Sequence, residues 1–309
     1  MEELKKTEEL TEEYEVELIE EVFVPALVES APVEKPKKGK LSKRAEKVSA
    51  EEDEDYSAFK ELALLMNTTV SAIKDECCSF QIKNLMSRMG KALVRFGVND
   101  KQMEKILLNA DILGMQEVVI SPSNLETCAK AVKKLNLERQ KVSLLIDFPF
   151  GESSFENKLL AIKEGKKAGV DGITVTLPQN ALSESRQKEL KKQLKKISRS
   201  FKGDIGISVS AEELTDNELK NLLKLTAKTK IKHIALMFGA VSEDTLISKL
   251  TFANKYKGKL KYKVLGNIET AVAVMNLFKL EVDVILTPYA DDIGKDLLQR
   301  FKVKSLKLK

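Results

Sequence analysis

The feature that most constrains the fold is an alternation, from about residue 99 onward, between short apolar runs and amphipathic stretches of helical periodicity. Such an alternation is typical of a parallel sheet built from βα units. The runs predicted to be strands are 117–121, 142–147, 172–177, 204–209, 233–238, 260–265 and 282–287. A further strand at 92–96 is doubtful, because Arg95 interrupts a short run. A spacing of roughly 25 to 35 residues per unit suits a (β/α)8 or TIM barrel.

The length of 309 residues leaves room for one barrel and an extension, since such barrels need about 250 residues. We predict three parts: a charged tail over 1–56, a helical cap with the doubtful first strand over 57–98, and the barrel over 99–309. Apolar residues recur at helical spacing within 57–90. This helical segment is either an end cap of the barrel or a dimerisation element.

The charge is divided unevenly along the chain. Residues 1–56 hold 9 Lys and Arg against 18 Asp and Glu, a net charge of −9, so the rest carries +14 to give the overall +5. Charged blocks repel one another and bury little apolar surface, so the tail is predicted to be disordered. Its apolar segment, residues 22–28, includes Phe23 and Leu27. It is either a motif that docks on a protein partner or a weak strand that folds back on the barrel.

The composition argues against several other classes of protein. No apolar run reaches the roughly 18 residues of a membrane span, and the first residues do not resemble a signal peptide. The cysteines, Cys77, Cys78 and Cys128, do not form a disulfide framework, and a single histidine, His233, leaves little to complete a zinc site. We therefore expect a cytoplasmic protein without a metal or other cofactor.

A more specific signal is the strand Leu145-Ile146-Asp147 followed by the turn Phe148-Pro149-Phe150-Gly151. It resembles the third strand of the deoxyribose-phosphate aldolase family. Further stretches resemble that family in the same order: 117–122, Lys158 with 169–171, 214–218, and 263–270. The resemblance covers roughly residues 99 to 300, about two thirds of the chain, and implies a class I aldolase barrel.

The family resemblance also implies where catalytic residues would lie. A class I aldolase needs a buried lysine amine that attacks the substrate carbonyl. In the family this lysine is on the sixth strand, where this chain has Ala235. The family's proton-transferring carboxylate on the fourth strand is matched by Thr174, and only the seventh-strand lysine is kept, as Lys263. Lys263 is either this family residue or one more surface lysine of a lysine-rich segment.

Phosphate recognition in the family relies on glycine-rich turns near helix N-termini, where backbone N–H groups favour an anion. The matching positions here are Gly239, Gly266, Asn267 and Thr287. Gly239 and Gly266 are kept, but Asn267 replaces a second glycine and Pro288 follows Thr287. His233, at the start of a strand, is expected to be a solvent-edge or hydrogen-bonded residue rather than a catalyst.

The sequence favours a barrel that has lost aldolase activity and serves as a protein-interaction or regulatory component. The tail would then be the contact arm. The alternative is a working lyase on deoxyribose 5-phosphate or a related phosphorylated sugar, with Lys263 as the Schiff-base amine. A second alternative is a nucleic-acid-associated protein, suggested by the lysines of 188–202. The apolar residues of that segment recur at the period of an outer barrel helix, which favours solvated lysines instead.

Overall fold

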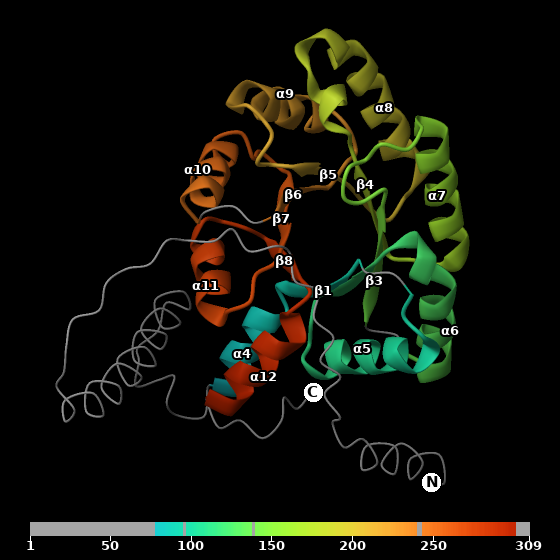
Figure 1. The fold of residues 1–309 in the computed structure, drawn as a ribbon, viewed down its shortest axis with the longest axis vertical. Helices are drawn as coiled ribbons and strands as arrows, with labels where there is room; N and C mark the ends of the chain where they lie inside the picture. Colours follow the sequence, from blue (N-terminus) through green and yellow to red (C-terminus); the bar gives the residue numbers. More distant parts are fainter. Residues whose placement is uncertain (1–77, 95–96, 138–139, 240–242, 301–309) are drawn as a thin grey trace, which may run out of the picture. The chain divides into compact units, whose positions relative to one another are not determined.

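The computed structural model describes residues 78–94, 97–137, 140–239 and 243–300 (Figure 1). The predicted tail over 1–56, its segment 22–28, most of the predicted helical cap and Cys77 lie outside the described residues. No helix in the described ranges is both long enough and apolar enough to cross a membrane.

The described chain forms a closed barrel of parallel strands joined in the order of the sequence, with helices around the outside (Figure 1). The predicted (β/α)8 barrel is confirmed. The strands are β1 (Met89–Leu93), β2 (Glu117–Ile120), β3 (Lys141–Ile146), β4 (Gly172–Thr176), β5 (Asp204–Ser210), β6 (His233–Phe238), β7 (Lys261–Gly266) and β8 (Val284–Thr287). Each of the seven strands named from the sequence is present within two residues of its expected ends.

The doubtful first strand is present but was misplaced. β1 begins three residues before the run at 92–96 and ends ahead of Arg95. It closes the barrel by pairing with β2 on one side and β8 on the other. The start of β1 was not recognised in the sequence, because Gly90 and Lys91 interrupt its apolar pattern. The Lys91 ammonium donates to the carbonyl oxygen of Pro288 at 2.5 Å and pairs with Asp291.

The helices follow the strands as a βα series requires. They are α4 (Cys78–Met86), α5 (Asp100–Ile112), α6 (Leu125–Leu135), α7 (Phe155–Ala168), α8 (Gln187–Ser200), α9 (Asp216–Thr226), α10 (Glu243–Asn254), α11 (Ala271–Lys279) and α12 (Ala290–Arg300). Short 3-10 turns are η1 (Pro122–Asn124), η2 (Gln179–Leu182) and η3 (Glu184–Arg186). Ser154 caps α7, and Thr215 forms a capping box with Glu218 at the start of α9. These side chains satisfy backbone N–H groups that a helix leaves unpaired at its N-terminus.

Helix α8 contains most of the lysine-rich segment. Leu190, Leu194 and Ile197 are buried against the barrel, whereas Lys188, Lys191 and Lys195 are exposed. This is the arrangement of an outer barrel helix, as the period of its apolar residues predicted.

Successive side chains of each strand point to opposite faces, so the barrel has two separate apolar clusters. The larger one lies between the strands and the helices. The smaller one, which we call the apolar layer, lies inside the barrel and consists of Ala92, Val119, Leu145, Met237, Leu265, Val284 and Leu286. Met237 and Leu265 also line a pocket at the carboxyl ends of the strands. The apolar layer is therefore the floor of the barrel mouth.

Candidate functional site

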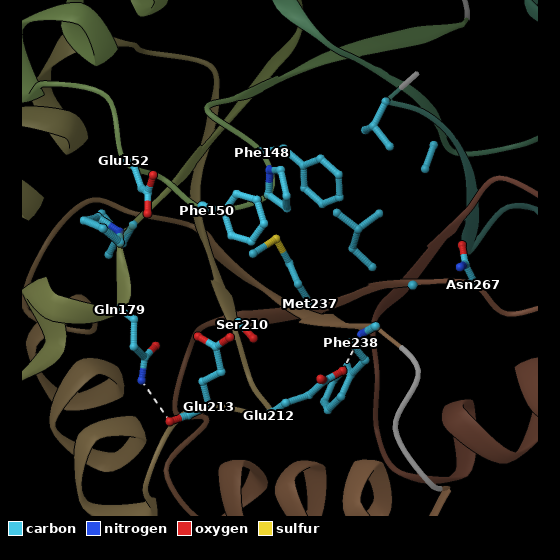
Figure 2. A pocket seen from close by; sticks show the side chains of 18 of the residues that line it. Phe148, Phe150, Glu152, Gln179, Ser210, Glu212, Glu213, Met237, Phe238 and Asn267 are labelled. Carbon is cyan, nitrogen blue, oxygen red and sulfur yellow. Dashed lines mark hydrogen bonds between the residues drawn. The ribbon is translucent and has the colours of Figure 1, made fainter. Parts of the chain in front are cut away.

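The barrel mouth holds a pocket of about 850 Å³ (Figure 2). In (β/α)8 barrels the loops that follow the strands form the ligand sites, and pockets of roughly 300–1,000 Å³ hold small molecules. The wall includes Phe148, Phe150 and Glu152 from the loop after β3, and Glu212 and Glu213 from the loop after β5. Among the described residues that line this pocket there is no lysine, arginine or histidine.

The loop after β3 is held by polar contacts at its base. One oxygen of the Asp147 carboxylate accepts from the backbone N–H and the hydroxyl of Ser153, each at 2.8 Å, and pairs with the Lys158 ammonium. Lys158 is buried and also donates to the carbonyl oxygen of Gly151 at 2.6 Å. Asp147 has a φ of 65°, a conformation that these contacts stabilise. They hold Phe148 and Phe150 at the mouth, where 38% and 69% of these residues are exposed.

Gly151 anchors the same loop to the end of β4. Its φ is 70°, and an added Cβ would lie 2.7–2.8 Å from backbone atoms of Thr176, Leu177 and Pro178. Both the conformation and the close approach require glycine. The Phe-Pro-Phe-Gly turn singled out in the sequence is thus a wall of the mouth.

The predicted phosphate-binding residues lie at or near the mouth. Gly239, Gly266 and Asn267 line the pocket. The backbone N–H of Gly239 already donates to the Glu212 carboxylate, so a fixed negative charge lies where this amide would meet a phosphate. Thr287 is buried behind the pocket, where its hydroxyl donates to the Ile268 carbonyl oxygen at 2.8 Å. Thr287 therefore joins two loops of the mouth.

Lys263 projects into the barrel interior, as the resemblance implied; the alternative of a surface lysine is wrong. The side chain is 4% exposed and is not part of the pocket lining. The next inward-facing residue of β7 is Leu265, in the apolar layer. The Lys263 amine lies below this layer, in the half of the barrel nearest the amino ends of the strands.

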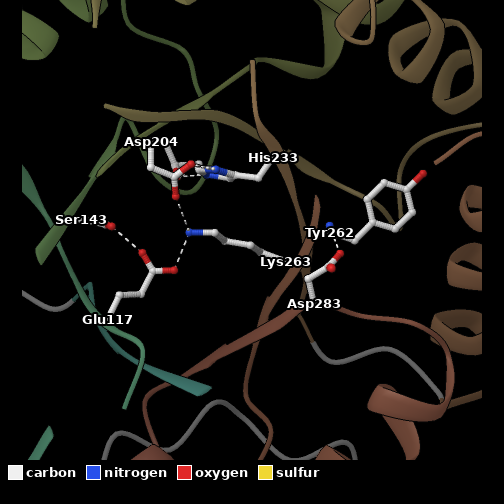
Figure 3. Close-up of polar contacts among 8 residues, drawn as sticks. Glu117, Ser143, Asp204, His233, Tyr262, Lys263 and Asp283 are labelled. Carbon is white, nitrogen blue, oxygen red and sulfur yellow. Dashed lines mark hydrogen bonds and ion pairs between the residues drawn. The ribbon is translucent and has the colours of Figure 1, made fainter. Parts of the chain in front are cut away.

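The amine of Lys263 is held in what we call the charged cluster: Glu117, Ser143, Asp204, His233 and Lys263, of which Asp204 is partly exposed (Figure 3). It pairs with one oxygen of Glu117, whose side chain is 3% exposed, while the Ser143 hydroxyl donates to the other oxygen. A carboxylate oxygen of Asp204 lies 3.6 Å from the amine. Glu117 and Asp204 are the first residues of β2 and β5, so the cluster lies at the amino end of the barrel.

His233 completes this cluster and is buried, so the expectation of a solvent-edge position is wrong and that of a hydrogen-bonded residue is correct. Its Nδ1 lies 3.1 Å from an Asp204 carboxylate oxygen, and its Nε2 lies 2.8 Å from the Thr174 hydroxyl. Burial and the nearby charge of Lys263 lower the pKa of His233. A neutral ring that donates from Nδ1 to Asp204 and accepts from Thr174 fits this geometry.

The ionisation of Asp204 is set by the same contacts. Burial opposes its charged form, but the hydrogen bond from His233 and the positive charge of Lys263 hold its pKa below the usual range. The cluster thus pairs two carboxylates with one ammonium and a neutral imidazole.

The two other positions implied by the family lie beside this cluster. Ala235 is 1% exposed and pairs in register with Lys263. Thr174 is 5% exposed, and its hydroxyl is the partner of the His233 ring. Neither residue lines the mouth pocket. Ala235 and Lys263 are therefore direct neighbours on adjacent strands, and Thr174 is joined to the charged cluster through its hydrogen bond with His233.

Outside the mouth and the charged cluster, the described chain has a buried free cysteine, Cys128. Burial raises the pKa of the Cys128 thiol to about 12, so this cysteine is a core residue rather than a nucleophile. Within the described ranges no group of three or more His, Cys, Asp or Glu side chains is arranged to hold a metal ion.

Several residues of these sites were missed in the sequence. Glu117 and Asp204 each begin an apolar strand, a position that normally marks the solvent edge. Glu212 and Glu213 were detectable, because charged residues directly after a barrel strand belong to the mouth.

The closed barrel with a pocket at the carboxyl ends of its strands places the chain among (β/α)8-barrel proteins with the usual ligand position of that class. No protein-family model matches the chain. It is similar to the deoxyribose-phosphate aldolase of Thermoanaerobacter pseudethanolicus, with 22% identity over 56% of this chain and 80% of that protein. It is also similar to the deoxyribose-phosphate aldolase of Dictyoglomus turgidum, with 22% identity over 66% of this chain and 92% of that protein.

The solved structures agree in fold. The tetrameric deoxyribose phosphate aldolase of Aeropyrum pernix superposes with a TM-score of 0.62 at 16% identity, over 77% of this chain and 96% of that one. The resemblance stated from the motifs is thereby confirmed: this chain is similar in sequence and in fold to deoxyribose-phosphate aldolases.

Proposed function

We propose that this protein is a ligand-binding or regulatory component that uses an aldolase-like barrel without Schiff-base catalysis. The observation that supports the proposal is the position of the Lys263 amine. It is paired with Glu117 beneath the apolar layer, while the pocket that would receive a substrate lies above that layer. A Schiff base requires an uncharged amine in contact with the substrate carbonyl.

The chemistry of the mouth supports the same proposal. Deoxyribose 5-phosphate carries a phosphate dianion, which cationic side chains or free backbone N–H groups would have to bind. The described lining has carboxylates at Glu152, Glu212 and Glu213 instead, and the Gly239 amide is bound to one of them. These carboxylates would repel the phosphorylated sugar.

A working lyase that uses Lys263 is the alternative. For this reaction, Lys263 would have to leave Glu117, lose its proton and reach past Met237 and Leu265. Separating a buried ion pair leaves an uncompensated charge, which costs about 3–5 kcal/mol. The names of the similar proteins favour this alternative, while the geometry of the site favours the first.

An aldol-cleavage assay distinguishes the two functions. Purified full-length protein is incubated with deoxyribose 5-phosphate and the release of acetaldehyde is followed. We expect no release above that of Lys263→Arg, a matched control that keeps the positive charge beside Glu117 but removes the primary amine. Turnover in the unaltered chain that Lys263→Arg abolishes, with the fold intact, would establish the lyase.

For the regulatory role we further propose, from the sequence alone, that residues 22–28 contact a protein partner. The double substitution Phe23→Ala with Leu27→Ala is expected to reduce partner capture from a cell extract. An unchanged set of captured proteins would refute the contact.

A further inference from the structure

The described lining of the mouth pocket is negatively charged, although the part of the chain that includes the barrel is positively charged overall. Residues 57–309 carry a net charge of +14, yet the described side chains that line the pocket include carboxylates and no cation. Figure 2 shows Glu152 separated from Glu212 and Glu213, with Phe148, Phe150 and Met237 pointing into the space near them. The pocket therefore combines separated negative charges with an apolar and aromatic surface.

The aromatic surface is organised before any ligand binds. The buried Lys158 ammonium ties Asp147 to the Gly151 carbonyl oxygen, and Gly151 packs on the backbone at the end of β4. The loop that carries Phe148 and Phe150 is thus anchored at both ends. A ligand that contacts these rings need not order the loop, so less of its binding free energy is lost.

Two kinds of interaction in this pocket select the same ligand chemistry. An ammonium group pairs with a carboxylate, and it is also attracted to the face of a phenylalanine ring. A methylene chain is stabilised by contact with apolar side chains such as Met237. A ligand that alternates ammonium groups with short methylene chains satisfies both, whereas a phosphorylated sugar satisfies neither.

We propose that the barrel mouth binds an aliphatic polyamine, with ammonium groups paired to Glu152 on one side and to Glu212 and Glu213 on the other. The methylene segments lie against Phe148, Phe150 and Met237. A pocket of about 850 Å³ is large enough for such a molecule. This inference rests on the proposed function, because a Schiff-base aldolase would need the same mouth for its sugar phosphate.

Isothermal titration calorimetry of the full chain with spermidine tests the proposal. We expect saturable binding that weakens as salt is added. The triple variant Glu152→Gln, Glu212→Gln and Glu213→Gln should bind spermidine at least about tenfold more weakly, since it loses the charged partners of the ligand.

The matched control is a triple variant of the acidic tail, Glu51→Gln, Glu52→Gln and Glu54→Gln, which changes the net charge by the same amount. It should bind as the unaltered chain does. Unchanged binding by the mouth variant would overturn the proposal, as would an equal loss in the tail variant. Both variants are first compared with the unaltered chain by circular dichroism.

Two further titrations test the ligand class. Diaminohexane should bind more tightly than hexylamine, because only the diamine reaches carboxylates on both sides of the pocket. Equal affinities would overturn the two-sided arrangement. The polyamine proposal and the proposed function are refuted by different results. Aldol cleavage that depends on Lys263 would refute the proposed function. If neither spermidine binding nor cleavage is observed, only the polyamine proposal is refuted.

Discussion

Replacing Lys263 with methionine should destabilise the fold strongly, because it removes one partner of a buried ion pair. Lys263 and Glu117 have side chains that are 4% and 3% exposed, and Glu117 also accepts a hydrogen bond from the Ser143 hydroxyl. Removing one partner of such a pair costs about 3–5 kcal/mol, since the other charge stays buried without compensation. Asp204 adds little to this figure, because its side chain is 44% exposed and screened by solvent.

The cost is large compared with the total stability of a domain, which is typically about 5–15 kcal/mol. With an m-value of about 3 kcal/mol/M, the urea midpoint of Lys263→Met should fall by ~1–2 M. Equilibrium unfolding followed by circular dichroism measures this change, provided that the transition remains two-state.

The double variant Lys263→Met with Glu117→Leu is the internal control. Replacing both charges with apolar side chains of similar volume is often neutral or stabilising, so much of the lost stability should return. A loss of less than about 1 kcal/mol in the single variant would refute the account of Lys263 as a buried ion-pair partner. The absence of recovery in the double variant would show that the cluster stabilises the barrel in another way.

Three other measurements test the described structure. The pKa of His233 is lowered in the folded protein, so the unfolded chain takes up a proton first, and the free energy of unfolding should fall as the pH drops below about 6.5. His233→Gln should reduce this fall, which is measured as urea midpoints between pH 7.5 and 5. An equal fall in the variant would contradict a lowered pKa of His233 as its cause. Gly206→Ala should cost about 1–3 kcal/mol in urea unfolding, because its Cβ would overlap the buried His233 ring, and an unchanged midpoint would show that the ring can move. Cys128 should remain unlabelled by iodoacetamide in the native protein when labelled peptides are mapped by mass, and rapid labelling would contradict its raised pKa.

The strands were predictable wherever burial on both faces left a continuous apolar run, as in β3 and β6. The position of β1 was not, because Gly90 and Lys91 lie in a strand that neighbouring strands hold in register. The inward position of Lys263 followed from the family resemblance. Its partner Glu117 could not be inferred, because the two residues are 146 positions apart and meet only when the barrel closes.

At the barrel mouth too, local sequence patterns predicted only part of the site. The Phe-Pro-Phe-Gly turn was recognised as a motif, but its effect on the pocket depends on Lys158 and on the backbone at the end of β4. The carboxylates at Glu212 and Glu213 follow β5 directly, so their place at the mouth was predictable once the barrel was accepted. That Glu212 binds the Gly239 amide depends on the distance between two loops, which no local pattern specifies.

Borohydride trapping tests the central claim most directly. The full-length protein is incubated with deoxyribose 5-phosphate or acetaldehyde, reduced with borohydride, digested and mapped by mass. The account predicts no adduct on the side chain of Lys263, because its amine is paired with Glu117 beneath the apolar layer. A reduced Schiff-base adduct on Lys263 would contradict the account and establish this residue as a catalytic amine.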